Sequence, residues 1–251
     1  MLSQTTLDHV DGYWAAFLGV PRGRLRPAKP LLVAHTGDLD DYGGMYAQSF
    51  GAPVVSLPAW ALERYGRAAA EAAGAGLVHD GRWHRVFGGL LDVVIGPAHV
   101  LYADAGTLRL HPADARVRTL DEADRPAVER LKAACGTTEW EHGGSDPGRD
   151  TVIGAFVEGA LAAVAGYEVW GGRIAHLAIV THPAHRGCGL GTRAVEGALR
   201  AALWVGLVPQ YRALADNAPS LRIAERLGFV PHSTSLAVRL RAPSGATESD
   251  L

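Results

Sequence analysis

A short glycine-rich segment, Arg186-Gly187-Cys188-Gly189-Leu190-Gly191-Thr192, has the residue spacing that most clearly indicates chemistry. It follows an apolar run over 174–181 and precedes an amphipathic stretch over 190–205. Glycine lets the backbone approach a ligand closely. The free N–H groups at the start of a helix attract anions. With the charge of Arg186 beside them, these glycines predict a site for a pyrophosphate group.

The glycine spacing alone leaves a second interpretation open, since an ordinary tight turn between a strand and a helix uses glycine in the same way. A dinucleotide-binding turn is disfavoured, because it needs Gly-x-Gly-x-x-Gly after an early strand. Here the pattern is Gly187-x-Gly189-x-Gly191, late in the chain. A phosphate loop of the Gly-Lys-Ser/Thr kind is excluded, because no such sequence follows.

The elements that must position this turn follow from hydrophobic patterning. Apolar runs at 152–157 and 160–169 are separated by Glu158-Gly159 and predict a β-hairpin. The apolar run at 174–181 predicts a third strand, and the apolar stripe of 190–205 predicts a helix. Further patterns predict helices at 120–134 and 219–227 and strands at 208–215 and 230–240.

Residues 1–115 are richer in turn-forming residues than the rest of the chain, and their pattern predicts a separate α/β unit. Strands are predicted at 31–34 and 54–57 and a helix at 59–73. Two strands, 90–95 and 99–103, are predicted to flank a Gly96-Pro97 turn. The hairpin at 152–169 is apolar on both faces and needs cover, so we expect that residues 1–115 cannot be removed without loss of solubility.

Composition excludes several functional classes. The chain has 251 residues, of which 48% are hydrophobic, and a formal net charge of -2. This balance gives no basic footprint for nucleic acid or anionic membrane. Two cysteines form no disulfide framework, and no apolar run is long enough to span a bilayer. The first ten residues lack a secretion-signal pattern, so we expect a cytoplasmic protein without a membrane or nucleic-acid partner.

Two motifs at a fixed separation resemble those of the GCN5-related N-acetyltransferases (GNAT). Residues 186–191 resemble the family's R/Q-x-x-G-x-G/A turn, and Asn217-Ala218-Pro219-Ser220 with Ala224-Glu225-Arg226-Leu227-Gly228-Phe229 is similar to its downstream segment. The resemblance covers about residues 116–241. It implies an α/β (α+β) fold with a GNAT-type mixed central sheet flanked by helices. The layout also resembles bacterial two-part acetyltransferases of the antibiotic-resistance type.

The resemblance implies acetyl-CoA as co-substrate and the residues that hold it. Strand residues would present backbone groups to the pantetheine arm and thioester, the glycine turn would hold the pyrophosphate, and the Asn217 segment would contact the arm. These implied cofactor-binding residues are Ile179, Val180, Thr181, Arg186, Gly187, Cys188, Gly189, Leu190, Gly191, Thr192, Asn217 and Ser220.

The sequence departs from the family where protons are transferred. The family's proton-donor tyrosine falls at Ala224, and a glutamate used as base by some members falls near Arg212. Tyr211 and Tyr167 are the substitute acids we consider.

Candidate bases are Glu139, Glu141 and His176. The two glutamates could instead be solvated loop residues, and His176 could be a core histidine whose ring nitrogens are hydrogen-bonded within the protein. If Glu139, Glu141 and Trp140 share a pocket, a cationic amine would be favoured there. His182 and His185 lack a third ligand, so we expect no metal site.

The expected domains are an N-terminal α/β domain (1–115), in which a degenerate GNAT-like copy is one alternative, an acetyltransferase domain (116–241) and a disordered tail (242–251). The expected activity is acetyl transfer from the thioester to a primary amine of a small molecule or peptide. The alternative is a catalytically weak CoA- or acetyl-CoA-binding module or sensor, motivated by Ala224 and Arg212. A homodimer is left open, and the acceptor is not identified by the sequence.

Overall fold

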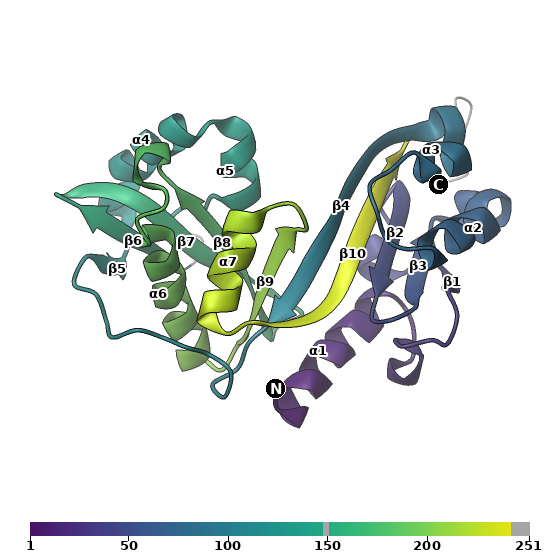
Figure 1. Cartoon of the computed structure of the whole chain (residues 1–251), viewed down its shortest axis with the longest axis horizontal. Helices are drawn as coiled ribbons and strands as arrows, with labels where there is room; N and C mark the ends of the chain where they lie inside the picture. Colours follow the sequence, from purple (N-terminus) through teal and green to yellow (C-terminus); the bar gives the residue numbers. More distant parts are fainter. Residues whose placement is uncertain (148–150, 242–251) are drawn as a thin grey trace. The chain divides into compact units, whose positions relative to one another are not determined.

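The computed structural model describes residues 1–147 and 151–241. Its α-helices are α1 (Gln4–Phe17), α2 (Ala59–Gly74), α3 (Arg82–Phe87), α4 (Arg125–Cys135), α5 (Thr137–Gly143), α6 (Leu190–Trp204) and α7 (Ala218–Leu227). Its strands are β1 (Leu31–Ala34), β2 (Gly44–Ser49), β3 (Pro53–Leu57), β4 (Leu91–Tyr102), β5 (Val117–Thr119), β6 (Val152–Val157), β7 (Ala160–Trp170), β8 (Ile174–Thr181), β9 (Val208–Leu214) and β10 (Val230–Leu240). Both sets are labelled in Figure 1. No described helix is long and apolar enough to cross a membrane.

The chain forms two compact units that interleave in sequence. Unit 1 comprises Met1–Thr6, Leu101–Arg212 and Ala218–Val230, and unit 2 comprises Leu7–Val100, Ala213–Asn217 and Pro231–Leu251. The segment of β10 after Val230 therefore belongs with residues 7–100 rather than with the glycine turn. The expected tail, 242–251, lies outside the described residues, and the division into domains 1–115 and 116–241 stays a prediction.

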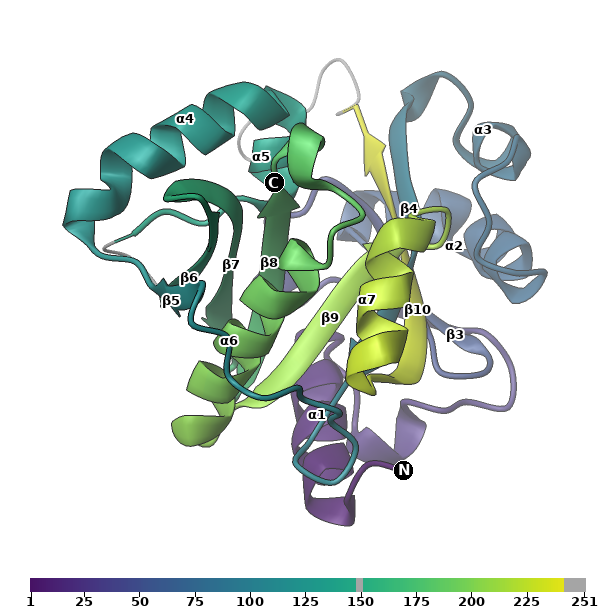
Figure 2. The same cartoon turned by 60° about the vertical axis from the view of Figure 1, so that its left-hand side comes forward.

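In unit 1 the strand order is β5-β6-β7-β8-β9. Each neighbouring pair from β5 to β8 is antiparallel, and β8 and β9 run parallel. Helix α6 packs on β6, β7 and β8, as Figure 2 shows from its side of the sheet. Helices α4 and α5 cover the opposite face, where Val164 and Val180 pack with Val128, Leu131 and Trp140. Helices of unit 1 therefore pack on both faces of the β6–β7 hairpin. The loss of solubility expected on removal of residues 1–115 stays a prediction.

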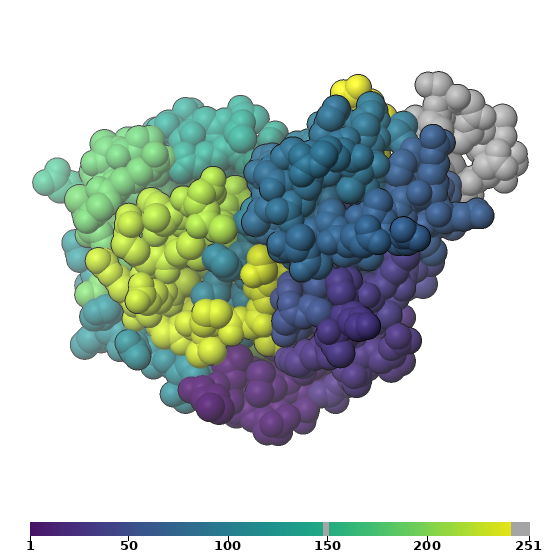
Figure 3. All heavy atoms as spheres, turned by 45° about the vertical axis from the view of Figure 1, so that its right-hand side comes forward, coloured from purple at the N-terminus to yellow at the C-terminus, as the bar shows by residue number. Residues whose placement is uncertain are grey.

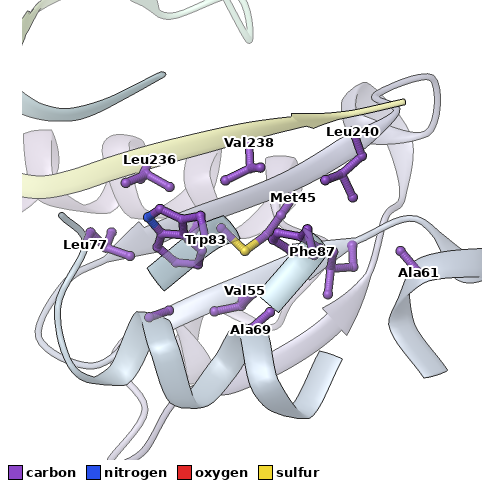
Figure 4. Close-up of a cluster of buried hydrophobic side chains, with 13 residues drawn as sticks. Met45, Val55, Ala61, Ala69, Leu77, Trp83, Phe87, Leu236, Val238 and Leu240 are labelled. Atoms are coloured by element: carbon purple, nitrogen blue, oxygen red, sulfur yellow. The ribbon is translucent and has the colours of Figure 1, made fainter. Parts of the chain in front are cut away.

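In unit 2 the strand order is β1-β3-β2-β10-β4. Strands β2 and β10 pair antiparallel, with Leu236 opposite Ala47 and Val238 opposite Met45. Figure 4 shows the core that results, with Trp83 and Phe87 of α3 and Met45 of β2 packed together beneath β10. This core needs side chains from both ends of the chain.

The predicted turn at Gly96-Pro97 is wrong, because β4 runs through both residues without interruption. The backbone of β10 passes close to Gly96, where a Cβ would lie 3.0 Å from the carbonyl oxygen of Ser235. Pro97 lacks an N–H but still accepts a hydrogen bond from the backbone N–H of Ala215 at 2.9 Å. A glycine-proline pair is therefore compatible with a strand here, since its missing donor and missing side chain are both tolerated.

Candidate functional site

The glycine turn lies between the end of β8 at Thr181 and the start of α6 at Leu190. Gly187 and Gly189 have φ angles of +77° and +80°, and a Cβ on either would meet no heavy atom within 4 Å. Gly189 is the N-cap of α6 and supplies no side-chain hydrogen bond to the first helical turn. The first N–H groups of a helix have no intrahelical partner. The turn therefore offers bare backbone and a helix N-terminus to an incoming anion.

Gly191 has a different role from the two glycines before it. A Cβ on Gly191 would lie 2.6 Å from Oγ1 of Thr181 and 3.7 Å from Cδ1 of Ile179. The absence of a side chain lets the first turn of α6 pack directly on the end of β8. A substitution at Gly191 would disturb this packing, so it cannot test anion binding cleanly.

Arg186 is held at the turn by two contacts. Its Nη2 group donates to both carboxylate oxygens of Glu139, at 2.7 and 2.8 Å, and its Nε–H donates to the carbonyl oxygen of Thr181 at 3.2 Å. The Glu139 pair is half-exposed. Glu139, a candidate base, thus lies against the arginine expected to bind pyrophosphate. The ion pair occupies both carboxylate oxygens of Glu139.

Strands β8 and β9 part at one identifiable position. Their described register pairs are Ile174 with Val208, Ala175 with Pro209 and His176 with Gln210. Beyond that point β8 continues to Thr181, so Ile179, Val180 and Thr181 lie on the segment that has left β9. Helix α5 ends close to this segment, because a Cβ on Gly143 would lie 2.4 Å from the carbonyl oxygen of Ile179.

His176 lies at the last paired position and belongs to a buried polar network. Its ring stacks on Trp170 with centroids 3.8 Å apart, and its Nδ1 donates to Oε1 of Gln210 at 2.7 Å. The amide nitrogen of Gln210 donates in turn to the hydroxyl of Tyr102. The Nδ1 proton leaves Nε2 with a free lone pair. Burial lowers the pKa of His176 to about 4, so the imidazole is neutral at pH 7.

Gln210, Tyr102 and Trp170 are not among the candidate site residues predicted from the sequence. The three residues lie 34, 74 and 6 positions from His176, which gives no local spacing signal. The sequence offers one hint, which is that Gln210 and His176 are polar residues within apolar runs. The structure shows that Gln210 is buried. Each needs a polar partner when it leaves water.

Tyr211 follows Gln210 on β9 and therefore points to the opposite face of the sheet. Its hydroxyl lies 3.0 Å from Oγ of Ser220 on α7, and its ring packs edge-on against Phe229. Burial raises the pKa of Tyr211 to about 12. Ser220 and the buried Ala224 are one helical turn apart on α7, so the Tyr211 hydroxyl reaches the helix beside the position where the family has a tyrosine. The other candidate acid, Tyr167, contacts Thr151 at 3.4 Å.

Trp140 does not share a pocket with Glu139 and Glu141, because its side chain points from α5 into the core while both glutamates are exposed. The condition under which a cationic amine would be favoured there is therefore not met. Cys188 is exposed in the glycine turn. Asn217 directly precedes α7, and its backbone N–H donates to Leu214. Within residues 1–147 and 151–241 no group of three or more His, Cys, Asp and Glu side chains is arranged to hold a metal ion.

A solved structure shows similarity at the level of the fold. A GCN5-related N-acetyltransferase from Kribbella flavida covers 98% of both chains with a TM-score of 0.52 and 18% identity. A GNAT-family protein from Novosphingobium aromaticivorans covers 90% of this chain and 95% of its own, with a TM-score of 0.47 and 22% identity. An acetyltransferase of the family from Colwellia psychrerythraea covers 64% and 62%, with a TM-score of 0.48 and 13% identity, so this chain spans less than two thirds of its length.

No match is found among curated proteins. The model of the Acetyltransferase (GNAT) family matches residues 116–229. This range contains the glycine turn, the parting of β8 and β9, and α7. The predicted resemblance is confirmed: residues 116–229 are a domain of the GNAT acetyltransferase family.

Proposed function

We propose that this chain is an acetyl-CoA-dependent N-acetyltransferase that acetylates a primary amine of a small molecule or peptide. The observation that carries the proposal is the open backbone at Gly187 and Gly189, at the N-terminus of α6 and next to the parting of β8 and β9. A side chain at either glycine would occupy the space that a pyrophosphate needs. The residues present therefore fit the group that the family uses.

The residues expected to hold the co-substrate come from both sides of the turn. Backbone N–H groups from Gly187 to Thr192, with Arg186, would bind the pyrophosphate. Backbone groups of Ile179–Thr181 would bind the arm and polarise the thioester carbonyl, and Asn217 and Ser220 would contact the arm. When bound, acetyl-CoA supplies an acyl group activated as a thioester.

The proton-transfer groups lie on opposite faces of the sheet where β8 and β9 part. His176 on β8 lies on the face covered by α4 and α5. Tyr211, which follows its partner Gln210 on β9, lies on the face covered by α7. An amine has a pKa near 10 and must lose a proton before or during attack. With Nδ1 committed to Gln210, the free Nε2 of His176 can accept a hydrogen bond from the attacking amine and orient it. Because its pKa is about 4, His176 does not retain a proton at pH 7, so water takes up the proton of the amine.

Glu139 and Glu141 remain the alternative bases. Glu141 is exposed at the end of α5, and Glu139 would first have to leave Arg186. Pyrophosphate bound to Arg186 would compete with that ion pair and free the carboxylate. We therefore rank His176 before Glu141 and Glu139, and Tyr211 as the group that donates a hydrogen bond toward the departing sulfur.

A binding module without turnover is the second candidate function. It is favoured by Ala224, which has no proton to give, and by the engagement of Glu139 with Arg186. The two candidates share the co-substrate site and differ in whether CoA thiol is released with an amine. Polarisation and positioning supply much of the rate of acyl transfer without a dedicated acid, which favours the enzyme.

Calorimetric titration with acetyl-CoA on wild type, Gly189→Asp and Gly189→Asn tests the site. Both variants place a side chain at φ +80°, but only aspartate adds a negative charge. We expect Gly189→Asp to bind at least about tenfold more weakly than Gly189→Asn, from charge repulsion at the pyrophosphate. Equal affinities of the two variants would refute this placement.

Thiol release measured with a panel of small amines and peptide N-termini then separates enzyme from binding module. Release that depends on both acetyl-CoA and an amine supports the enzyme. Tight binding without any release across the panel supports the module.

A further inference from the structure

Unit 2 contains a cavity of its own, with a volume of about 620 Å³. One side of the cavity is lined by α2, through Trp60, Arg64 and Tyr65. The other side is lined by Arg85 and Phe87 of α3 and by the Gly88–Leu90 turn. The blue segment that carries these helices faces the viewer in Figure 3 and is open to solvent there. Small-molecule sites have volumes of roughly 300–1,000 Å³, so the cavity is of the right size for a small organic ligand.

The aromatic walls of the cavity are held by the core of unit 2. Phe87 is buried in that core, and its ring centroid lies 5.6 Å from that of Tyr65. Trp60 and Tyr65 are partly buried against the same core. These rings are therefore fixed before any ligand arrives, which lowers the entropy cost of binding.

The glycine turn at 88–89 keeps the cavity open. Gly88 has a φ angle of +57°, and a Cβ on Gly88 or Gly89 would meet no heavy atom within 4 Å. Larger residues at these positions would project side chains into unfilled space at the cavity wall. The turn also ends α3, whose last residue is Phe87.

The charge in the cavity is entirely positive. Arg64 and Arg85 line it, and no acidic side chain does. Neither arginine belongs to an ion pair among the described residues, although the neighbouring arginines do: Arg67 pairs with Glu71, and Arg82 with Asp80. The guanidinium of Arg64 lies over the ring of Tyr65 at 5.3 Å, a contact that orients the planar group.

We propose that this cavity binds an aromatic carboxylate. A guanidinium presents parallel N–H donors that match the two oxygens of a carboxylate. Three aromatic side chains beside two such groups suit a ligand with a flat apolar body and one anionic end. The proposal concerns unit 2 alone and does not depend on acetyl-CoA binding in unit 1.

Calorimetry with benzoate, 2-naphthoate and indole-3-carboxylate on the full chain tests the proposal. We expect 2-naphthoate to bind with a Kd of about 1 mM, the affinity of a ligand of its size at the efficiency usual for drug-sized molecules. The neutral analogue 2-naphthalenemethanol should bind at least about tenfold more weakly, because it lacks the charge that the arginines recognise.

Arg64→Gln and Arg85→Gln should each weaken 2-naphthoate binding at least about fivefold. Arg67→Gln is the matched control, since Arg67 is an exposed arginine of the same helix that does not line the cavity. Both arginines of the cavity are exposed, so their variants should retain the wild-type melting temperature. The indole N–H signal of Trp60, assigned by its loss in Trp60→Phe, should shift on titration.

Three outcomes would overturn the proposal. One is the absence of binding of all three carboxylates to wild type up to about 10 mM. The second is equal affinity for the neutral analogue. The third is an effect of Arg67→Gln as large as those of Arg64→Gln and Arg85→Gln, which would indicate only a general response to surface charge.

Discussion

His176 should make the protein less stable as the pH falls from 7.5 to 5, and His176→Asn should remove that loss. Burial lowers the pKa of His176 to about 4 in the folded protein, whereas the ordinary value is 6.5. Between these values the unfolded chain binds a proton that the folded protein excludes. The free energy of unfolding therefore falls as the pH drops through 6.5, and the loss saturates below about pH 4.

The size of the effect follows from the two pKa values. With 6.5 for the unfolded chain and about 4 for the folded protein, His176 contributes a loss of about 2 kcal/mol at pH 5 relative to pH 7.5. For a protein of this size that loss corresponds to a decrease in Tm of roughly 4–8 °C. Asparagine cannot be protonated and keeps an amide near the position of Nδ1, where it can still donate to Gln210.

Urea unfolding at pH 7.5 and pH 5, followed by tryptophan fluorescence, measures this difference. Burial also lowers the pKa of His35 and His232, but both remain in the variant, so comparing the two proteins isolates His176. His142→Asn, which alters an exposed histidine of α5, is the control and should keep the wild-type pH dependence. Wild type and His176→Asn could instead lose the same free energy of unfolding between the two pH values. In that case the folded protein does not keep the imidazole neutral, and our account of His176 is wrong.

Three further predictions concern unit 1. Glu139→Gln should tighten CoA binding about two- to fivefold in calorimetry, because it removes a negative charge beside Arg186; an unchanged affinity would place Arg186 outside the pyrophosphate site. Tyr211→Phe should cost about 1 kcal/mol of stability through the lost bond to Ser220, and lower kcat at least about tenfold without changing the KM for acetyl-CoA; a kcat within twofold of wild type would exclude it as the donor. Glu196→Ala should lower the free energy of unfolding by about 2 kcal/mol in urea titrations. The reason is that the buried Glu196 carboxylate accepts hydrogen bonds from His111, in the loop before β5, and from Arg193 of α6. A loss under about 0.5 kcal/mol would show that these hydrogen bonds do not stabilise the protein.

The elements that carry the glycine turn could be predicted because their signals are local. The strand at 174–181 and the helix beginning at 190 agree with β8 and α6. Each has an apolar pattern of one clear period and ends at glycine or at a change of polarity. The helix expected at 120–134 begins only at Arg125, after a short turn capped by Asp121.

The arrangement of the two units could not be predicted, because it depends on pairing between distant residues. Strand β10 was expected as a strand, yet its partner β2 (Gly44–Ser49) was not. Thr234 pairs with Ser49, 185 positions away, and nothing near either residue specifies the other. The same holds for the network at His176, where Tyr102 and Gln210 are 108 positions apart. Local propensity predicts that each strand exists, whereas the pairing of strands depends on the whole core.

The missing tyrosine at Ala224 changes what the remaining acid can do. Tyr211 reaches the same turn of α7 from β9, but its pKa of about 12 lies well above the ordinary thiol value of roughly 8.5. Full proton transfer from Tyr211 to a thiolate would be uphill by more than three pKa units, about 5 kcal/mol. Tyr211 can therefore stabilise developing charge on sulfur through a hydrogen bond, while water supplies the proton. A hydrogen bond to a charged group is worth at least about 1.5 kcal/mol, so the loss expected for Tyr211→Phe is at least about tenfold. Removal of an obligatory acid would cost much more.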